Sequence, residues 1–109
     1  KYEFSFVLDF PGYEEGIYPD ASAFNYKDII SEDSINNLAE KQEYKTVNFD
    51  KIIDDISISK ITNKITEGST PKYEDVYTIK VTKNAIGNKK IAKAFLTDLA
   101  RIKGLQKLF

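Results

Sequence analysis

The first segment of the chain alternates apolar and polar residues, and this pattern limits the fold more than any other feature. One side of the segment carries Tyr2, Phe4, Phe6 and Leu8, and the other carries Glu3, Ser5, Val7 and Asp9. Successive side chains of a β-strand point to opposite faces, so this period of two predicts a strand with one buried face. Pro11 and Gly12 end the strand, because proline has no N–H to donate and glycine permits a turn.

Alternation returns in two later segments, and a helical period follows them. Residues 56–59 alternate and continue less regularly through Ile61 and Ile65, and residues 77–82 alternate again beyond a turn cluster at 68–71. This pattern predicts a β-hairpin with a loose connection. Asn88 is the expected cap of a helix with one apolar stripe and one basic face. The stripe comprises Ile91, Ala92, Phe95, Leu96, Leu99 and Ile102, and the basic face comprises Lys89, Lys90, Lys93, Arg101 and Lys103.

Polar cap residues predict short helices between the first strand and the hairpin. Asn25 precedes one at 26–30, Ser31 precedes one that ends near Gln42, and Asn48 precedes a turn of helix over Phe49. The order β-α-α-β-β-α indicates an α+β fold, with a small antiparallel or mixed sheet covered by helices on one face. The simplest arrangement is a ferredoxin-like variant that lacks its last strand. Residues 105–109 would then begin a following segment.

The composition suits one soluble domain spanning residues 1–109. A chain of 109 residues, 41% hydrophobic and 30% charged, can bury one core. The chain contains no Met, so we expect it to be a piece of a longer protein. It also has no window of about 18 apolar residues, so the sequence predicts no membrane span within it.

Two missing residue types exclude whole classes of chemistry. The chain has no Cys, which excludes disulfides, thiolate metal sites and thiol catalysis. It has no His, which removes the commonest general base and excludes a Ser-His-Asp enzyme. No nucleotide-binding motif occurs, and the acidic pI of about 5.5 argues against nucleic acid as the partner of the basic helix face. We therefore expect no catalytic residue, no cofactor and no metal.

Charge is distributed unevenly along the chain. Residues 1–55 contain 13 acidic and 5 basic residues, a net of −8, whereas residues 56–109 contain 4 acidic and 11 basic residues, a net of +7. One interpretation is that the two halves pack together and their charges interleave on the surface. The other is a molecule with opposed faces that associates with copies of itself or with an anionic lipid or polymer.

The loop at 12–25 is the candidate binding surface. Its aromatic residues could stack on sugar rings or peptide groups, or fold inward as anchors together with Ile17. Its carboxylates could ligate Ca²⁺ or Mg²⁺ or form a glycosidase pair, but the spacing does not match an EF-hand and the chain has no Trp for a sugar cleft. The residues selected for recognition are Tyr13, Glu14, Glu15, Tyr18 and Asp20.

A family resemblance begins with residues 6–31, FVLDFPGYEEGIYPDASAFNYKDIIS, and continues in ISIS, VYTIKVTK and KKIAKAFLTDLARI. These segments resemble the extracytoplasmic domains of Wzz-type polysaccharide chain-length determinants of Firmicutes. The resemblance implies a domain held between membrane helices that lie outside this chain. It also implies oligomerisation and association with a polymerase, without catalytic residues. It transfers no site residue.

Three functional hypotheses follow, and an enzyme is the last of them. The first is a non-enzymatic extracytoplasmic domain of a membrane-anchored surface protein of a Gram-positive bacterium. Its partners would be copies of itself or another membrane protein, in the export or length control of an envelope polysaccharide. The alternative is a glycan- or peptide-binding module that uses the loop at 12–25. A carboxylate-based hydrolase comes last.

Overall fold

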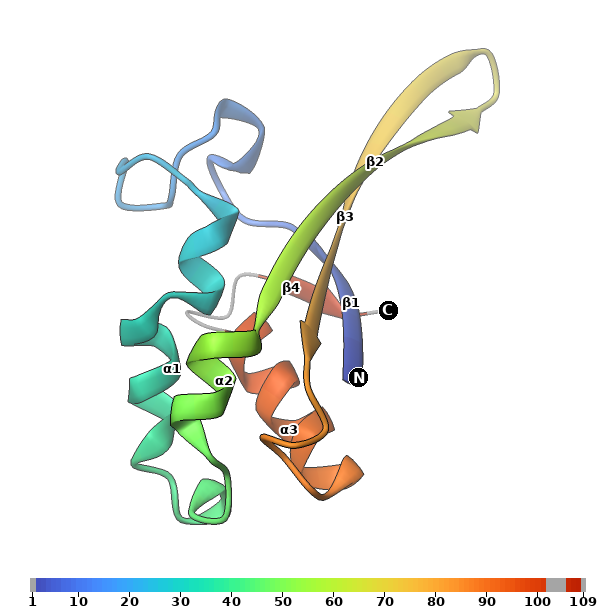
Figure 1. Ribbon diagram of the computed structural model, residues 1–109. Coiled ribbons are helices and arrows are strands. Elements are labelled where there is room, and N and C mark those ends of the chain that lie inside the picture. The colour runs from blue at the N-terminus through green and yellow to red at the C-terminus, as the bar shows by residue number, and fades with distance from the viewer. Residues whose placement is uncertain (1, 102–105, 109) are drawn as a thin grey trace.

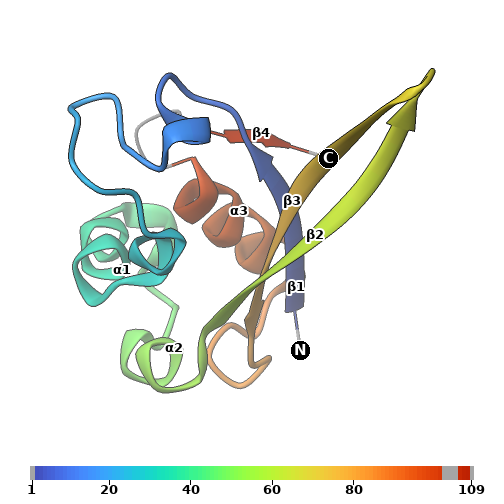
Figure 2. The same cartoon turned by 90° about the horizontal axis from the view of Figure 1, so that it is seen from above.

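A computed structural model describes residues 2–101 and 106–108 (Figure 1). Strands β1 (Tyr2–Leu8), β2 (Ser57–Glu67) and β3 (Thr70–Val81) form an antiparallel sheet, with the short β4 (Gln106–Leu108) beside β1. The strand order is β2-β3-β1-β4. Helices α1 (Glu32–Ala39), α2 (Phe49–Asp55) and α3 (Lys89–Ala100) lie on one side of the sheet (Figure 2). The predicted small α+β fold is confirmed.

The prediction that the last strand is missing was wrong. β4 pairs with β1 in antiparallel register, with Val7 opposite Lys107 and Leu8 opposite Gln106. A strand of three residues is too short for a period of two to stand out, so this tail was assigned to a following segment. The expected stripe residue Ile102 lies outside the described residues.

The core forms where α3 packs on β1 and β3. Phe6 and Leu8 of β1 and Tyr77, Ile79 and Val81 of β3 are all buried. α3 packs on β1, and α1 packs on both α2 and α3, which makes a second helical layer. The Phe95 ring of α3 links the layers, because it meets the rings of Tyr44 and Phe49 edge to face at centroid distances of 5.3 and 5.8 Å.

The four predicted helix caps are confirmed. The side chains of Asn25, Ser31, Asn48 and Asn88 each accept a backbone N–H of the following helix, in a 3₁₀ helix η2 (Tyr26–Ile30) and in α1, α2 and α3. Helix α1 ends at Ala39, earlier than predicted, and a 3₁₀ turn η3 (Gln42–Tyr44) follows it. This turn places the buried Tyr44 under α3, where its hydroxyl donates to Asp98.

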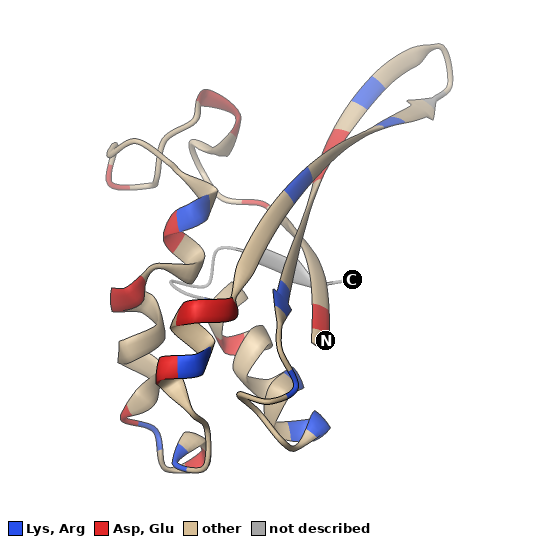
Figure 3. Ribbon diagram, in the orientation of Figure 1, with Lys and Arg blue, Asp and Glu red and all other residues tan. Residues whose placement is uncertain are grey.

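The ion pairs connect the acidic and basic halves of the chain. Lys41 pairs with Asp98 at 3.3 Å, and Lys80 of β3 pairs with Glu3 of β1 at 3.6 Å. Figure 3 shows acidic residues along the loop after β1 and along the α1 and α2 layer, and basic residues at the start of α3 and on the hairpin. The two charges therefore meet at some contacts but remain partly separated in space.

The hairpin extends far beyond the rest of the sheet (Figures 1 and 2). β2 and β3 pair from Ser57 opposite Lys80 to Glu67 opposite Thr70, whereas β1 pairs with β3 only up to Tyr77. Residues 61–76, called the arm below, therefore form a two-stranded ribbon. The expected loose connection is a tight turn at Gly68 and Ser69, with Gly68 at a φ of 62°.

We predict that Phe95→Ala strongly destabilises the domain, whereas Ile61→Ala on the arm does not. Phe95 is fully buried and Ile61 is 60% exposed. Removing a buried phenylalanine costs about 3–5 kcal/mol, and an exposed substitution stays within about 0.5 kcal/mol. Urea denaturation measures both free energies of unfolding. Equal losses in the two variants would contradict a core centred on α3.

Candidate functional site

The loop after β1 is held together by its own aromatic side chains. Phe10, Tyr13, Tyr18 and Phe24 form a cluster with ring centroids 5.3 to 6.0 Å apart. Gly12 adopts a φ of 95°, and a Cβ there would lie 2.8 Å from the Ile17 carbonyl oxygen, so the turn requires glycine. The aromatic residues are thus the anchors that the second interpretation of the loop predicted, while Ile17 itself is exposed.

A groove of about 860 Å³ separates this loop from the arm. The loop contributes a short 3₁₀ helix, η1 (Tyr13–Glu15), and the hairpin contributes residues of both strands, with Ile65, Lys72 and Glu74 among them. Among the described residues, Tyr73 is the most exposed large hydrophobic side chain, at 68%. The side chains that define the groove come from both walls and are Tyr13, Glu14, Glu15, Lys60, Tyr73 and Asp75.

Hydrogen bonds connect the two walls of the groove. The Tyr13 hydroxyl donates to Asp75 Oδ2 at 2.8 Å and lies 2.6 Å from the Tyr77 hydroxyl. Thr62 of β2 donates to the other Asp75 oxygen at 2.6 Å. Because the Tyr13 hydroxyl already donates its hydrogen bond to Asp75, the Tyr77 hydroxyl is the donor in the bond between the two tyrosines. The loop is therefore fixed to the base of the arm.

The electrostatics of this network favour a charged Asp75 and neutral phenols. The Thr62 hydrogen bond lowers the pKa of Asp75, against the effect of burial, and Tyr13 and Lys60 lower it further. Burial raises the pKa of Tyr13, and its bond to Asp75 adds to this effect. Burial also raises the pKa of Tyr77. A carboxylate held in its charged form is not suited to act as the general acid of a hydrolase.

The five residues selected from the sequence do not form one site. Tyr13, Glu14 and Glu15 line the groove together. Tyr18 borders a separate cavity of about 380 Å³ and donates to Asp28 at 3.1 Å, and burial together with Asp28 raises the pKa of Tyr18 to about 12. Asp20 accepts bonds from the backbone N–H and hydroxyl of Ser22, as in a local turn.

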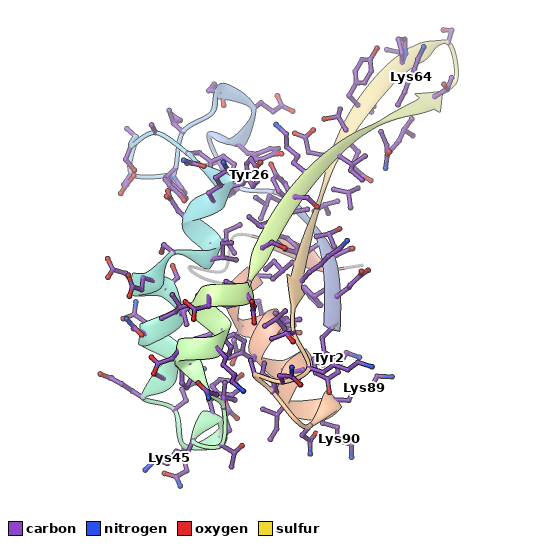
Figure 4. The ribbon with its side chains drawn as sticks, in the orientation of Figure 1. Tyr2, Tyr26, Lys45, Lys64, Lys89 and Lys90 are labelled. Atoms are coloured by element: carbon purple, nitrogen blue, oxygen red, sulfur yellow. The ribbon has the colours of Figure 1, made fainter. Side chains whose placement is uncertain are left out.

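The arm supplies candidate residues that the sequence analysis missed. Figure 4 shows Lys64 far out on the arm and Tyr26 at its base, where the Lys60 ammonium lies 5.8 Å from the Tyr26 ring centre. Ile61 and Ile65 of β2 are 60% and 37% exposed, and Ile65 also borders the groove. Their spacing of four places both on one face of the strand that the sequence predicts through Ile61 and Ile65, but the sequence does not show that this face stays exposed.

The register defines this second face. Ile58 lies opposite the buried Ile79, so even-numbered residues of β2 face the helices and odd-numbered residues face away from them. The outer face of the arm therefore consists of Ile61, Asn63 and Ile65 of β2 with their partners Val76, Glu74 and Lys72 of β3. β2 is also the last strand on its side of the sheet, so one of its backbone edges is open.

Within residues 2–101 and 106–108, no group of three or more acidic side chains gathers closely enough to hold a metal ion. Across the same part of the chain, no helix is both long and apolar enough to cross a bilayer.

Comparisons with protein-family models, with curated proteins and with solved structures find no match to this chain. Function must therefore be argued from the two surfaces just described, the groove and the outer face of the arm. The groove combines charges of both signs with tyrosines, and the outer face combines two isoleucines with an open strand edge.

We predict that Tyr13→Phe lowers the free energy of unfolding at neutral pH. We also predict that the free energy of unfolding of this variant falls less than that of the wild type when the pH is raised above about 10. Loss of the bond to the charged Asp75 costs about 1.5–3 kcal/mol. The folded pKa of Tyr13 lies above its unfolded value, so its contribution is full below about pH 10 and declines as the pH rises further. Urea denaturation at about pH 7 and about pH 11 should show the gap between wild type and variant narrowing.

Tyr73→Phe is the matched control, because Tyr73 borders the same groove but is mostly exposed. Its free energy of unfolding should follow that of the wild type at both pH values. A constant gap between wild type and Tyr13→Phe would show that the Tyr13 hydroxyl is not held in its neutral form by the fold.

Proposed function

We propose that this chain is a non-enzymatic interaction domain that works by self-association through its arm. The observation that carries this proposal is the pair of exposed isoleucines, Ile61 and Ile65, beside an open strand edge on a projecting ribbon. A two-stranded ribbon is marginally stable in water, and exposed edges readily pair with further strands. Covering this surface with another copy would remove apolar area from water and satisfy the open backbone groups.

The wider setting of the proposal comes from the family resemblance. A Wzz-like domain would sit on the extracytoplasmic side of a Gram-positive cell membrane and act in envelope polysaccharide export or chain-length control. Membrane attachment would come from segments outside this chain, with another membrane protein or a polysaccharide as further partners. The reading frame around the coding region tests this setting, because hydrophobic spans are expected on both sides of the domain. A reading frame without such spans would contradict the proposed membrane setting.

We also propose that the topology is a variant of the ferredoxin-like fold. Support comes from the strand order β2-β3-β1-β4, with antiparallel neighbours throughout. Helices connect β1 to β2 and β3 to β4, as in a split β-α-β arrangement. The long arm and the additional helices before β2 distinguish this chain from the simplest form of that arrangement.

A second candidate function is recognition of a glycan or a peptide in the groove. The observation that favours it is the open Tyr73 ring, which lies in the same groove as the loop carboxylates Glu14 and Glu15. An exposed ring can stack on a sugar or a peptide group, and carboxylates can accept the hydroxyl or amide hydrogens around it.

We predict that the domain is a dimer at high concentration and that Ile61→Lys/Ile65→Lys makes it monomeric. Two charges placed on the outer face oppose burial of that face. Sedimentation at about 100 µM suits the weak affinity expected of a small interface. Tyr73→Lys is the control, because it adds a charge to the opposite face of the same arm and should leave the dimer intact. A wild type that stays monomeric would refute self-association.

For the second candidate, we predict that an oligosaccharide or an extended peptide perturbs the groove selectively. ¹⁵N-labelled protein titrated with a panel of both should show amide shifts at Glu14, Glu15 and Tyr73. Glu14→Gln/Glu15→Gln should weaken the response without changing stability, because both carboxylates are exposed. Tyr13→Ala is unsuitable here, since it would disrupt the aromatic cluster. Perturbations that spread over the surface or are absent at millimolar ligand would dismiss this candidate.

A further inference from the structure

We infer that two copies of this chain join through their β2 edges in one defined antiparallel register, with Asn63 of one copy opposite Asn63 of the other. This inference rests on the proposed self-association and specifies its geometry. β2 is an edge strand of eleven residues, and residues 59–66 are all exposed. The opposite edge of the sheet is formed by β4, which has three residues. β3 also has an open edge over residues 70–76, where Pro71 has no N–H to donate, so the edge of β2 is the longest open one among the described strands.

Pairing like edges also limits the size of the assembly. When β2 pairs with β2 of a second copy, the β2 edges of both copies are consumed and the contact closes as a two-fold dimer. Pairing β2 with the β4 edge of another copy would leave a free edge at each end and produce an open ribbon. An eleven-residue strand gains few ladder bonds from a partner of three residues, which favours the closed arrangement.

The isoleucines select the register. Centring the pairing on Asn63 places Ile61 of each copy opposite Ile65 of the other, so two aliphatic pairs flank the central amides on the outer face. Centring it on Ile61 forms only one isoleucine pair and leaves Ile65 opposite Ser57. Registers centred between two residues pair opposite faces, so they never place Ile61 against Ile61 or Ile65. Cross-strand aliphatic pairs stabilise a sheet, which favours the arrangement centred on Asn63.

The charges select the same register. Centring on Asn63 places Lys60 opposite Thr66 and Lys64 opposite Thr62. Centring on Thr62 would place Lys60 opposite Lys64 twice, and centring on Lys64 would place two copies of that residue together. Like charges directly opposite each other destabilise a sheet.

On the helix-facing side of the sheet, the preferred register also brings Lys64 of one copy toward Asp75 of the other. Thr62 donates to Asp75, which lies directly opposite it within one copy. Lys64 of the second copy would lie on the other side of Thr62, so its ammonium extends toward the Asp75 carboxylate. The hydrogen-bonded network at the base of the groove thus presents a negative charge to the incoming strand.

Cysteine crosslinking tests the register directly, because the natural chain contains no cysteine. Asn63→Cys should form a disulfide-linked dimer under mild oxidation, since facing Cα atoms lie about 4.5–5.5 Å apart, within disulfide range. Ser59→Cys is the matched control, an exposed residue of the same strand. In this register the two Ser59 residues would lie about 27 Å apart, at about 3.4 Å per residue, and should not crosslink.

The outcomes separate the register from self-association itself. Crosslinking of Asn63→Cys alone, abolished by adding Ile61→Lys/Ile65→Lys, is the expected result. A wild type that sediments as a dimer while Asn63→Cys crosslinks no better than Ser59→Cys would overturn the register and leave self-association standing. Stronger crosslinking of Ile61→Cys than of Asn63→Cys would overturn it in favour of the arrangement centred on Ile61. A wild type that is monomeric at about 100 µM would overturn both proposals.

Discussion

The packing of α3 against β1 and β3 is the interaction on which the rest of the structure depends. Phe6 and Tyr77 stack with ring centroids 5.7 Å apart, and Phe95 and Leu99 of α3 are buried in the same core. β1 pairs with β3 only as far as Tyr77, so the hairpin beyond this residue has no third strand. The division between a stable body and an uncovered arm thus follows from the lengths of the strands.

The loop after β1 joins these two parts. Its aromatic cluster belongs to the body, while the Tyr13 hydroxyl reaches Asp75 on the arm. A single tyrosine therefore contributes to the packing of the loop and to the position of the ribbon that projects beside it. The aromatic cluster and the base of the arm therefore share one residue, Tyr13.

The sequence predicted the elements that have an apolar face or a clear cap. The alternation from Tyr2 to Leu8, the stripe of α3 and the four polar caps depend on neighbouring residues, so they are visible without the fold. The arm was underestimated because its strands contact no core and carry polar residues on both faces. The groove depends on Tyr13 meeting Asp75 across 62 positions in the chain, a contact that no local pattern contains.

The direction of the arm restricts how copies of this domain could be arranged at a membrane. β1 and β2 both run antiparallel to β3, so they run parallel to each other and the tip of the arm points away from Tyr2. In a pair joined through antiparallel β2 strands, the two Tyr2 ends would point in opposite directions. Copies anchored in one membrane would have to lay their joined arms flat along its surface. Copies anchored in two facing membranes could instead direct their joined arms perpendicular to both membranes and span the gap between them.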